Sequence, residues 1–338
     1  MSSDDAVAGS GPALQIPRGE PDAETAALIH STAERYRNWG RWGDDDQAGT
    51  LNFITPEKIR EAAGLVRTGR VISLALPFDA NGPQSGQFGR VNPIHVMLLT
   101  GTDSDAGALP LPHGFGAADD AVYMPLQCGT QWDGLSHIFD RGRMWNGYPA
   151  TEVSAFSGAQ RNGIEQLSDR IVSRGVLLDI ASAKGVEALE DGYAITEDDL
   201  QEAIGTQGPT ASVGTGDVVL VRTGHMGRCR RDGWGSYAGG DAPGLSFGTA
   251  DWLHRTEIAA LATDTWGVEV RPNELPGSFQ PLHQIMVPNI GLLVGEIFDL
   301  EELAADCAAD GVWEFMFVAA ALPFTAACGS PVNPQAIK

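Results

Sequence analysis

The chain has 338 residues and a formal net charge of −22 at pH 7, from 44 acidic and 22 basic side chains. This excess of negative charge argues against nucleic acid and against anionic membrane surfaces as partners. A hydrophobic content of 43% is enough for a large core, and 42 glycines indicate many turns.

Four cysteines (Cys128, Cys229, Cys307 and Cys328) show no regular spacing, which favours free thiols in a reducing compartment. The N-terminal stretch is acidic and lacks an apolar leader, and no apolar run is long enough to span a bilayer. We therefore expect a cytoplasmic protein that acts on a small molecule. Residues 1–20 are expected to form a flexible arm, and residues 21–338 a single domain.

In chain order, two helices come first. Residues 22–38 are rich in alanine with helical spacing, and Thr55, Pro56 and Glu57 begin a second helix that ends near Gly69. Strand-length apolar runs then occur at 70–76, 94–99, 121–133, 174–180, 218–222, 257–263, 291–298 and 313–322. Further helices are predicted over 195–204, 249–255, 279–286 and 300–309, and long loops over 77–89, 100–120 and 223–246. Because strands alternate with helices and several strands are almost wholly apolar, we predict an α/β fold with a mixed central sheet and flanking helices.

The segment Met124–His137, with the sequence MPLQCGTQWDGLSH, contains the densest group of polar candidates. On an extended strand, Gln127, Gln131 and Asp133 share one face, and Trp132 lies on the other. A short turn can then return His137 over the polar face. Cys128 falls on the opposite face from Asp133, which favours a buried thiol over a nucleophile.

Asp133 and His137 have two further candidate partners downstream, His283 on a predicted helix and Glu296 on a predicted strand. Two histidines and two carboxylates can hold Zn²⁺ or Mn²⁺. Sequence spacing does not show that these residues meet, and a helical histidine such as His283 also suits a packed position. The chain has no glycine-rich dinucleotide motif, no phosphate-binding loop and no nucleophile elbow.

Several other residues are candidates for a substrate pocket. Asp264 ends a predicted strand, and His225 follows another strand end. Trp132 and Trp266 are among the tryptophans in or beside loops and strand ends, which suits a flat, neutral or aromatic substrate. The alternative interpretation is that these tryptophans only pack loops onto the sheet.

The eleven residues from Gln127 to His137 resemble the signature of the cyclase family, His-x-Gly-Thr-His-x-Asp-x-x-x-His. That family includes bacterial kynurenine formamidase and isatin hydrolase. Further matches are Arg222-Thr223-Gly224, the strand end at Asp264, Leu282-His283 and Gly295-Glu296. The resemblance implies a swivelling β/β/α fold, a homodimer or homotetramer, and a metal-dependent hydrolase that opens amides, lactams, lactones or activated carbonyls with metal-bound water.

By position, the resemblance implies that Asp133, His137, His283 and Glu296 form one metal site, with Asp133, His137 and Glu296 also catalytic. The other site of two-metal relatives has lost its two histidines, which are Gln127 and Gln131 here. An amide oxygen is a weak, neutral ligand. We therefore expect at most one divalent ion, Mn²⁺ or Zn²⁺, and expect Gln127 and Gln131 to bind substrate or water.

Three alternatives remain open from the sequence. One is a metal-free enzyme in which His137 is the base and Asp133 or Glu296 orients it. The second is a cyclase, dehydratase or isomerase that acts on a ring ketone or polyketide-like substrate without consuming water. The third is a binding protein without catalytic activity.

Overall fold

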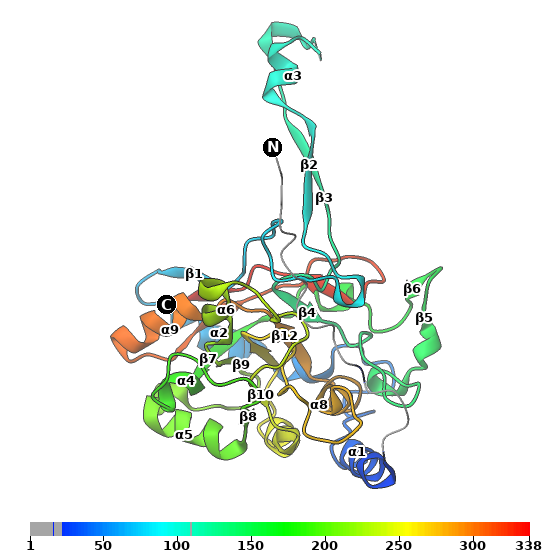
Figure 1. Ribbon diagram of the computed structural model, residues 1–338, viewed down its shortest axis with the longest axis vertical. Coiled ribbons are helices and arrows are strands. Elements are labelled where there is room, and N and C mark those ends of the chain that lie inside the picture. The colour runs from blue at the N-terminus through cyan, green and yellow to red at the C-terminus, as the bar shows by residue number, and fades with distance from the viewer. Residues whose placement is uncertain (1–15, 17–21, 109) are drawn as a thin grey trace, which may run out of the picture.

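A nine-stranded mixed sheet forms the centre of the molecule, in a computed structural model that describes residues 16, 22–108 and 110–338 (Figure 1). The strand order is β1 (Val71–Ser73), β15 (Gln335–Ile337), β13 (Glu314–Val318), β7 (Val172–Asp179), β9 (Val218–Arg222), β11 (Ala260–Thr263), β12 (Leu293–Glu296), β4 (Gln131–Asp133) and β14 (Gly329–Pro331). The four strands from β7 to β12 in this order are parallel, and the outer strands pair antiparallel. The predicted α/β fold with a mixed central sheet is confirmed. The arm predicted for residues 1–20 lies outside the described residues, apart from Ile16.

The described residues also form three two-stranded sheets and a set of short helices. The small sheets pair β2 (Ile94–Leu99) with β3 (Asp119–Tyr123), β5 (Val153–Ser154) with β6 (Gly158–Ala159), and β8 (Ala194–Ile195) with β10 (Gly244–Leu245). The β2–β3 sheet projects away from the body (Figure 1). The helices are α1 (Ala23–Arg35), α2 (Pro56–Ala63), α3 (Gly101–Asp105), α4 (Ile180–Ala183), α5 (Glu197–Gln207), α6 (His225–Asp232), α7 (Ala250–Arg255), α8 (Pro281–Ile285) and α9 (Glu301–Asp310). In the described ranges, no helix combines the length and the apolar character needed to cross a membrane.

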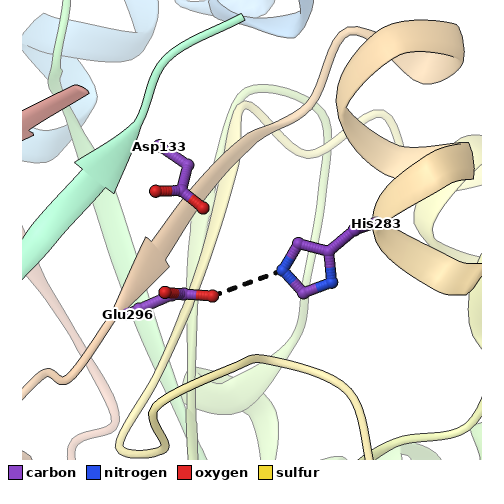
Figure 2. Close-up of side chains that lie close together, drawn as sticks. All are labelled: Asp133, His283 and Glu296. Carbon is purple, nitrogen blue, oxygen red and sulfur yellow. Dashed lines mark hydrogen bonds and ion pairs between the residues drawn. The ribbon is translucent and has the colours of Figure 1, made fainter. Parts of the chain in front are cut away.

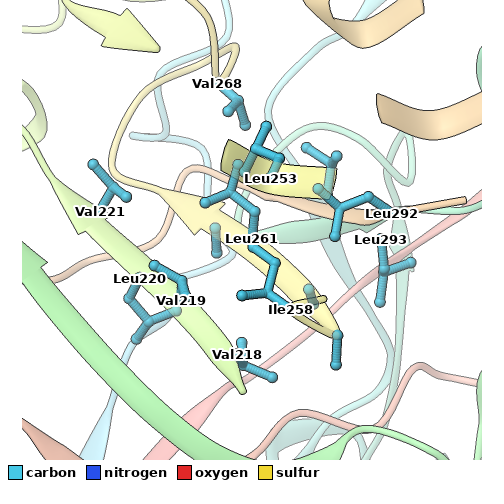
Figure 3. Close-up of a cluster of buried hydrophobic side chains, with 14 of the residues drawn as sticks. Val218, Val219, Leu220, Val221, Leu253, Ile258, Leu261, Val268, Leu292 and Leu293 are labelled. Atoms are coloured by element: carbon cyan, nitrogen blue, oxygen red, sulfur yellow. The ribbon is translucent and has the colours of Figure 1, made fainter. Parts of the chain in front are cut away.

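The core is centred on the parallel strands. Val219 of β9 pairs with Leu261 of β11, and both side chains are fully buried (Figure 3). Leu253 of α7 packs in the same cluster. Since both faces of these strands are covered, their sequences are apolar without alternation.

The predicted strand over 121–133 is wrong, because the structure divides it into β3 and β4. A turn separates the two strands, in which the Cys128 amide donates to the Pro125 carbonyl at 3.2 Å. Proline cannot donate to a sheet ladder, so Pro125 suits an interruption at this point. Gln127 therefore lies in the turn and not on the strand that carries Gln131 and Asp133.

The loop predicted over 223–246 is also wrong in part, because it contains α6. This helix carries Arg228, Arg230 and Arg231 and buries only its first two residues, His225 and Met226. With so few buried apolar positions it lacks the helical periodicity on which the prediction depended.

Candidate metal centre

Strands β4 and β12 place three polar side chains on one face of the sheet. The strands are antiparallel, with Gln131 opposite Glu296 and Asp133 opposite Val294. Because side chains alternate along a strand, Gln131, Asp133 and Glu296 share a face. All three are at most 3% exposed.

Trp132 points to the other face, into the core. Its ring is fully buried, its indole N–H donates to the Ala319 carbonyl at 2.8 Å, and it packs edge-on against Phe298. Gly295 lies opposite it, where an added Cβ would approach the Trp132 ring to 2.7 Å. This side chain therefore fills the core behind the site, and substrate binding by Trp132 stays a prediction.

Helix α8 brings His283 to the carboxylates. The backbone amides of Leu282 and His283 donate to the Glu269 carboxylate at 3.0 Å, which fixes the start of the helix. Glu269 Oε1 also lies 2.6 Å from Nδ1 of His283, and the other ring nitrogen, Nε2, lies 3.3 Å from Glu296 Oε1 (Figure 2). A proton on Nδ1 directed at Glu269 leaves Nε2 free to act as a ligand, as in many metal sites.

Asp133, His283 and Glu296 together offer a donor set that fits a divalent cation. One ligand atom from each lies within 4.8 Å of the other two, and Figure 2 shows the three side chains converging from β4, α8 and β12. Burial and the Asp133 carboxylate raise the pKa of Glu296. Burial lowers the pKa of His283, but its hydrogen bonds to Glu269 and Glu296 outweigh this effect and raise it. Crowded, buried carboxylates beside an imidazole match the chemistry of a Zn²⁺ or Mn²⁺ site.

His137 lies beside this group without joining it closely. It follows β4 through a turn in which its amide donates to the Gly134 carbonyl at 2.9 Å. Its Nε2 is 3.8 Å from Asp133 Oδ1. Burial lowers the pKa of His137, and the Asp133 charge offsets part of that change. His137 as a fourth ligand stays a prediction.

A small cavity of about 20 Å³ opens over the group. This volume is close to the minimum that accommodates one water molecule. The lining residues are Phe88, Arg90, Asp133, His137, Ile138, Trp266, Gln280, His283 and Glu296. Within this lining the Phe88 ring stacks on Trp266 with centroids 6.2 Å apart, and the Arg90 guanidinium lies 5.2 Å from the Trp266 centroid.

The two glutamines of the motif differ in position. Nε2 of Gln131 donates to Asp133 Oδ1 at 3.2 Å and to Glu296 Oε2 at 2.9 Å, so this amide bridges the two carboxylates. Its Oε1 is buried and has no hydrogen-bond partner among the described residues. Gln127 instead packs near Gly329, in the neighbouring strand β14. Of these two glutamines, Gln131 is the one for which the described residues show direct contact with the candidate metal ligands.

Of the other predicted substrate-binding residues, Trp266 lines the cavity, whereas Asp264 and His225 do not. The buried Asp264 carboxylate accepts hydrogen bonds from the Thr223 and Gly224 amides and from the Thr223 hydroxyl, and so holds the turn into α6. His225 is 3% exposed and stacks on Tyr237 at 5.3 Å. Asp264 is thus held by hydrogen bonds and His225 by packing, both outside the cavity lining, and substrate binding by either residue stays a prediction. Cys128 is buried, as the thiol interpretation predicted, and burial raises its pKa to about 11.

Sequence reasoning missed Glu269, Arg90, Phe88 and Gln280. Glu269 lies fourteen residues before His283, and no motif links the two positions. Phe88 and Arg90 come from the loop predicted over 77–89 and its end. The composition of this loop indicates turns, but it does not show where the side chains point. Their roles depend on tertiary contacts that no local pattern records.

Comparison with known proteins gives a family for this chain. The family described as Putative cyclase matches residues 72–270. The solved structure of a novel cyclase is 38% identical over 90% of this chain and 99% of its own, with a TM-score of 0.81. Isatin hydrolase A from Labrenzia aggregata (17% identity, 81% of this chain and 94% of its own, TM-score 0.56) has a similar fold. So has isatin hydrolase A from Ralstonia solanacearum (16% identity, 79% and 91%, TM-score 0.57). A search of curated proteins gave no match. With a family match over more than half of its length and a solved relative of this identity, the chain belongs to the cyclase family.

Proposed function

We propose that this protein is a hydrolase that uses one divalent ion to open an amide, lactam or lactone of a small molecule. The observation that carries the proposal is the convergence of Asp133, His283 and Glu296 under a cavity, in a member of the cyclase family. Two proteins of similar fold are named isatin hydrolases, which supports hydrolysis of a ring amide as the reaction class.

The ion would be held by Asp133, Glu296 and Nε2 of His283. When bound, it supplies a Lewis acid that polarises a carbonyl and lowers the pKa of a water molecule. Glu269 keeps His283 in the required orientation through its contact with Nδ1. Gln131 fixes the orientations of both carboxylates by donating to one oxygen of each.

We assign the proton transfer to His137. It borders the cavity and lies 3.8 Å from Asp133, so its imidazole can take a proton from the nucleophile and return it to the leaving group. Trp266 and Phe88 add a flat apolar surface to the cavity lining, which suits a planar or cyclic substrate once the exposed Phe88 side chain moves aside, because the cavity as it stands holds about one water molecule.

The decisive measurement is metal content by mass spectrometry after purification and dialysis. We expect about one Mn²⁺ or Zn²⁺ per wild-type chain and less than about a tenth in His283→Ala, because the variant loses a ligand of the site. His95→Ala changes an exposed histidine that neither belongs to the donor set nor lines the cavity, so it is the matched control and should keep its ion. Full occupancy in His283→Ala would refute the assignment.

Hydrolysis itself needs a separate assay. The wild-type protein is incubated with isatin and with a panel of ring amides and lactones in ¹⁸O water, and the label is followed into the product. Label at the new carboxylate supports hydrolysis. Turnover without incorporation would instead indicate ring closure or isomerisation, and would refute the proposed reaction.

A further inference from the structure

Arg271 is a buried arginine without a carboxylate partner among the described residues. It is 8% exposed, and its Nη2 donates to the Gly239 carbonyl at 3.1 Å. Its other terminal nitrogen, Nη1, is buried and has no hydrogen-bond partner in the described part of the chain. Arginine stays charged in proteins, and a buried charge is costly unless it is paired. Arg271 can therefore bind an anionic group that the chain itself does not supply.

A second buried arginine, Arg174, shows how the chain pairs such a charge elsewhere. Arg174 is 6% exposed and lies 2.6 Å from the Asp217 carboxylate and 2.7 Å from that of Glu314. At Arg271 the balance is different. Burial lowers the pKa of Arg271, and the charges of three more distant carboxylates raise it by less: Glu269, Asp241 and Glu296. The described residues thus compensate the charge of Arg271 only in part.

The guanidinium of Arg271 lies beside the cavity over the candidate metal centre. Its Cζ is 5.9 Å from the ring centroid of Trp266 and 5.3 Å from that of Phe279. Trp266 lines the cavity together with the candidate metal ligands, and Arg90 of the same lining adds a second positive charge near the indole ring. A planar ring that lies against Trp266 can therefore present one end to the candidate metal centre and the other end to Arg271.

Phe88 now lies where such a ring would stack. Its side chain is almost parallel to Trp266, with an angle of 6° between the two rings, and it meets Phe279 edge-on at 6.0 Å. It is also 55% exposed, so little packing holds it from outside. Gly86 and Gly89 flank Phe88, which itself has φ 53°, a left-handed conformation that is uncommon for a bulky residue. Displacement of the Phe88 ring would make room for a substrate ring in the same place.

We propose that Arg271 binds a carboxylate on the substrate, whose ring replaces Phe88 against Trp266. The substrate is then a planar ring amide or lactone that also carries a carboxylate, and in this respect the inference rests on the proposed function. A guanidinium is planar and matches the geometry of a carboxylate. Beside the two aromatic rings that contact Arg271, a flat carboxylate fits better than a tetrahedral phosphate. The carboxylate supplies the negative charge that the described residues do not place at Nη1.

Calorimetric titration of the full chain in saturating Mn²⁺ tests the proposal with two matched ligands. Isophthalamate and isophthalamide share a ring and one amide, and differ only in whether the second group is a carboxylate or an amide. We expect Arg271→Met to weaken the binding of isophthalamate at least about tenfold and that of isophthalamide less than about twofold, because the variant loses a charge-assisted hydrogen bond. Arg37→Met is the matched control and should change neither affinity, since Arg37 also lies over a tryptophan, Trp39, but does not line the cavity.

Equal weakening of the two ligands in Arg271→Met overturns the proposal, as does a wild type that does not bind isophthalamate at millimolar concentration. Arg271→Lys keeps the positive charge and should bind isophthalamate more tightly than Arg271→Met does. The wild type alone provides a comparison that does not depend on the folding of a variant, because it should prefer isophthalamate to isophthalamide at least about tenfold. Phe88→Ala should strengthen the binding of both ligands, whereas unchanged or weaker binding contradicts the displacement of Phe88.

The metal content of the same samples separates this inference from the proposed function. A wild type that holds no Mn²⁺ but shows the Arg271-dependent preference for isophthalamate contradicts the proposed function and supports the carboxylate site. A protein that holds Mn²⁺, but in which Arg271→Met has no selective effect, contradicts the carboxylate site and leaves the candidate metal centre as proposed.

Discussion

Asp133 and Asp217 are both buried aspartates of the central sheet region, but they are neutralised differently. Asp217 directly precedes β9 and lies 2.6 Å from both the Lys58 ammonium and the Arg174 guanidinium. Asp133 makes no ion pair with a lysine or arginine in the described part of the chain, and its contacts are the Gln131 amide and, at 3.8 Å, His137. Buried charges are tolerated when they are paired. The chain itself supplies that pairing at Asp217, whereas at Asp133 it leaves room for a cation from outside, which supports the proposed ion.

The largest effect is expected when the ion pair of Asp217 with Arg174 is removed. In Arg174→Met, Asp217 loses one of its two cationic partners while the apolar stem is kept. Removing one partner of a buried pair costs about 3–5 kcal/mol, so we expect a loss of this size in the free energy of unfolding from urea titration. The metal content should not change, because the ion pair lies outside the candidate metal centre.

Arg60→Met is the control for that experiment, because the ion pair of Arg60 with Glu57 is exposed at the surface. Such pairs contribute little, and we expect no measurable loss. If Arg174→Met were as stable as Arg60→Met, the Asp217 network would not stabilise the fold, and the contrast with Asp133 would lose its meaning.

A smaller effect is expected at Glu269, which supports His283 in the candidate metal centre. Glu269→Gln keeps the size of the side chain that orients His283 but removes its charge. Loss of such a supporting carboxylate typically lowers metal affinity by about 10–100-fold. Competition with a fluorescent chelator measures this change directly. An affinity within twofold of wild type would show that His283 does not depend on Glu269 for its orientation.

These two regions also differ in how far the sequence could predict them. The parallel strands were predicted well because their apolar runs reflect burial on both faces, as at β9 and β11. Asp133, His283 and Glu296 were identified through the motif and its downstream partners, and the structure brings all three together. Glu269 was not identified, because its contact with His283 depends on how α8 packs against the rest of the chain, and no local sequence pattern indicates this packing.

Asp264 and Trp132 show what the sequence leaves undetermined at the site. Asp264 ends a predicted strand and Trp132 directly precedes Asp133, so both were candidates for substrate binding. In the structure the Asp264 carboxylate accepts hydrogen bonds from backbone amides, and the Trp132 ring is packed in the core. A sequence pattern gives the face of a strand but not the partner of a polar group, and only the partner separates a reactive carboxylate from a structural one.

The smallest effect is expected at Gln131, whose neutral amide lies between the carboxylates of Asp133 and Glu296. Gln131→Leu removes the donor to Asp133 and Glu296, but it also removes the unpartnered Oε1, so the two changes partly offset each other. We expect a loss of about 1 kcal/mol in the free energy of unfolding in excess chelator.

With saturating Mn²⁺ the loss for Gln131→Leu should shrink, since a bound ion would compensate the same carboxylates. Gln127→Leu, at the motif glutamine that does not contact them, should show no such dependence on metal. Equal losses for Gln131→Leu with and without Mn²⁺ would mean that the amide and the ion do not share the carboxylates.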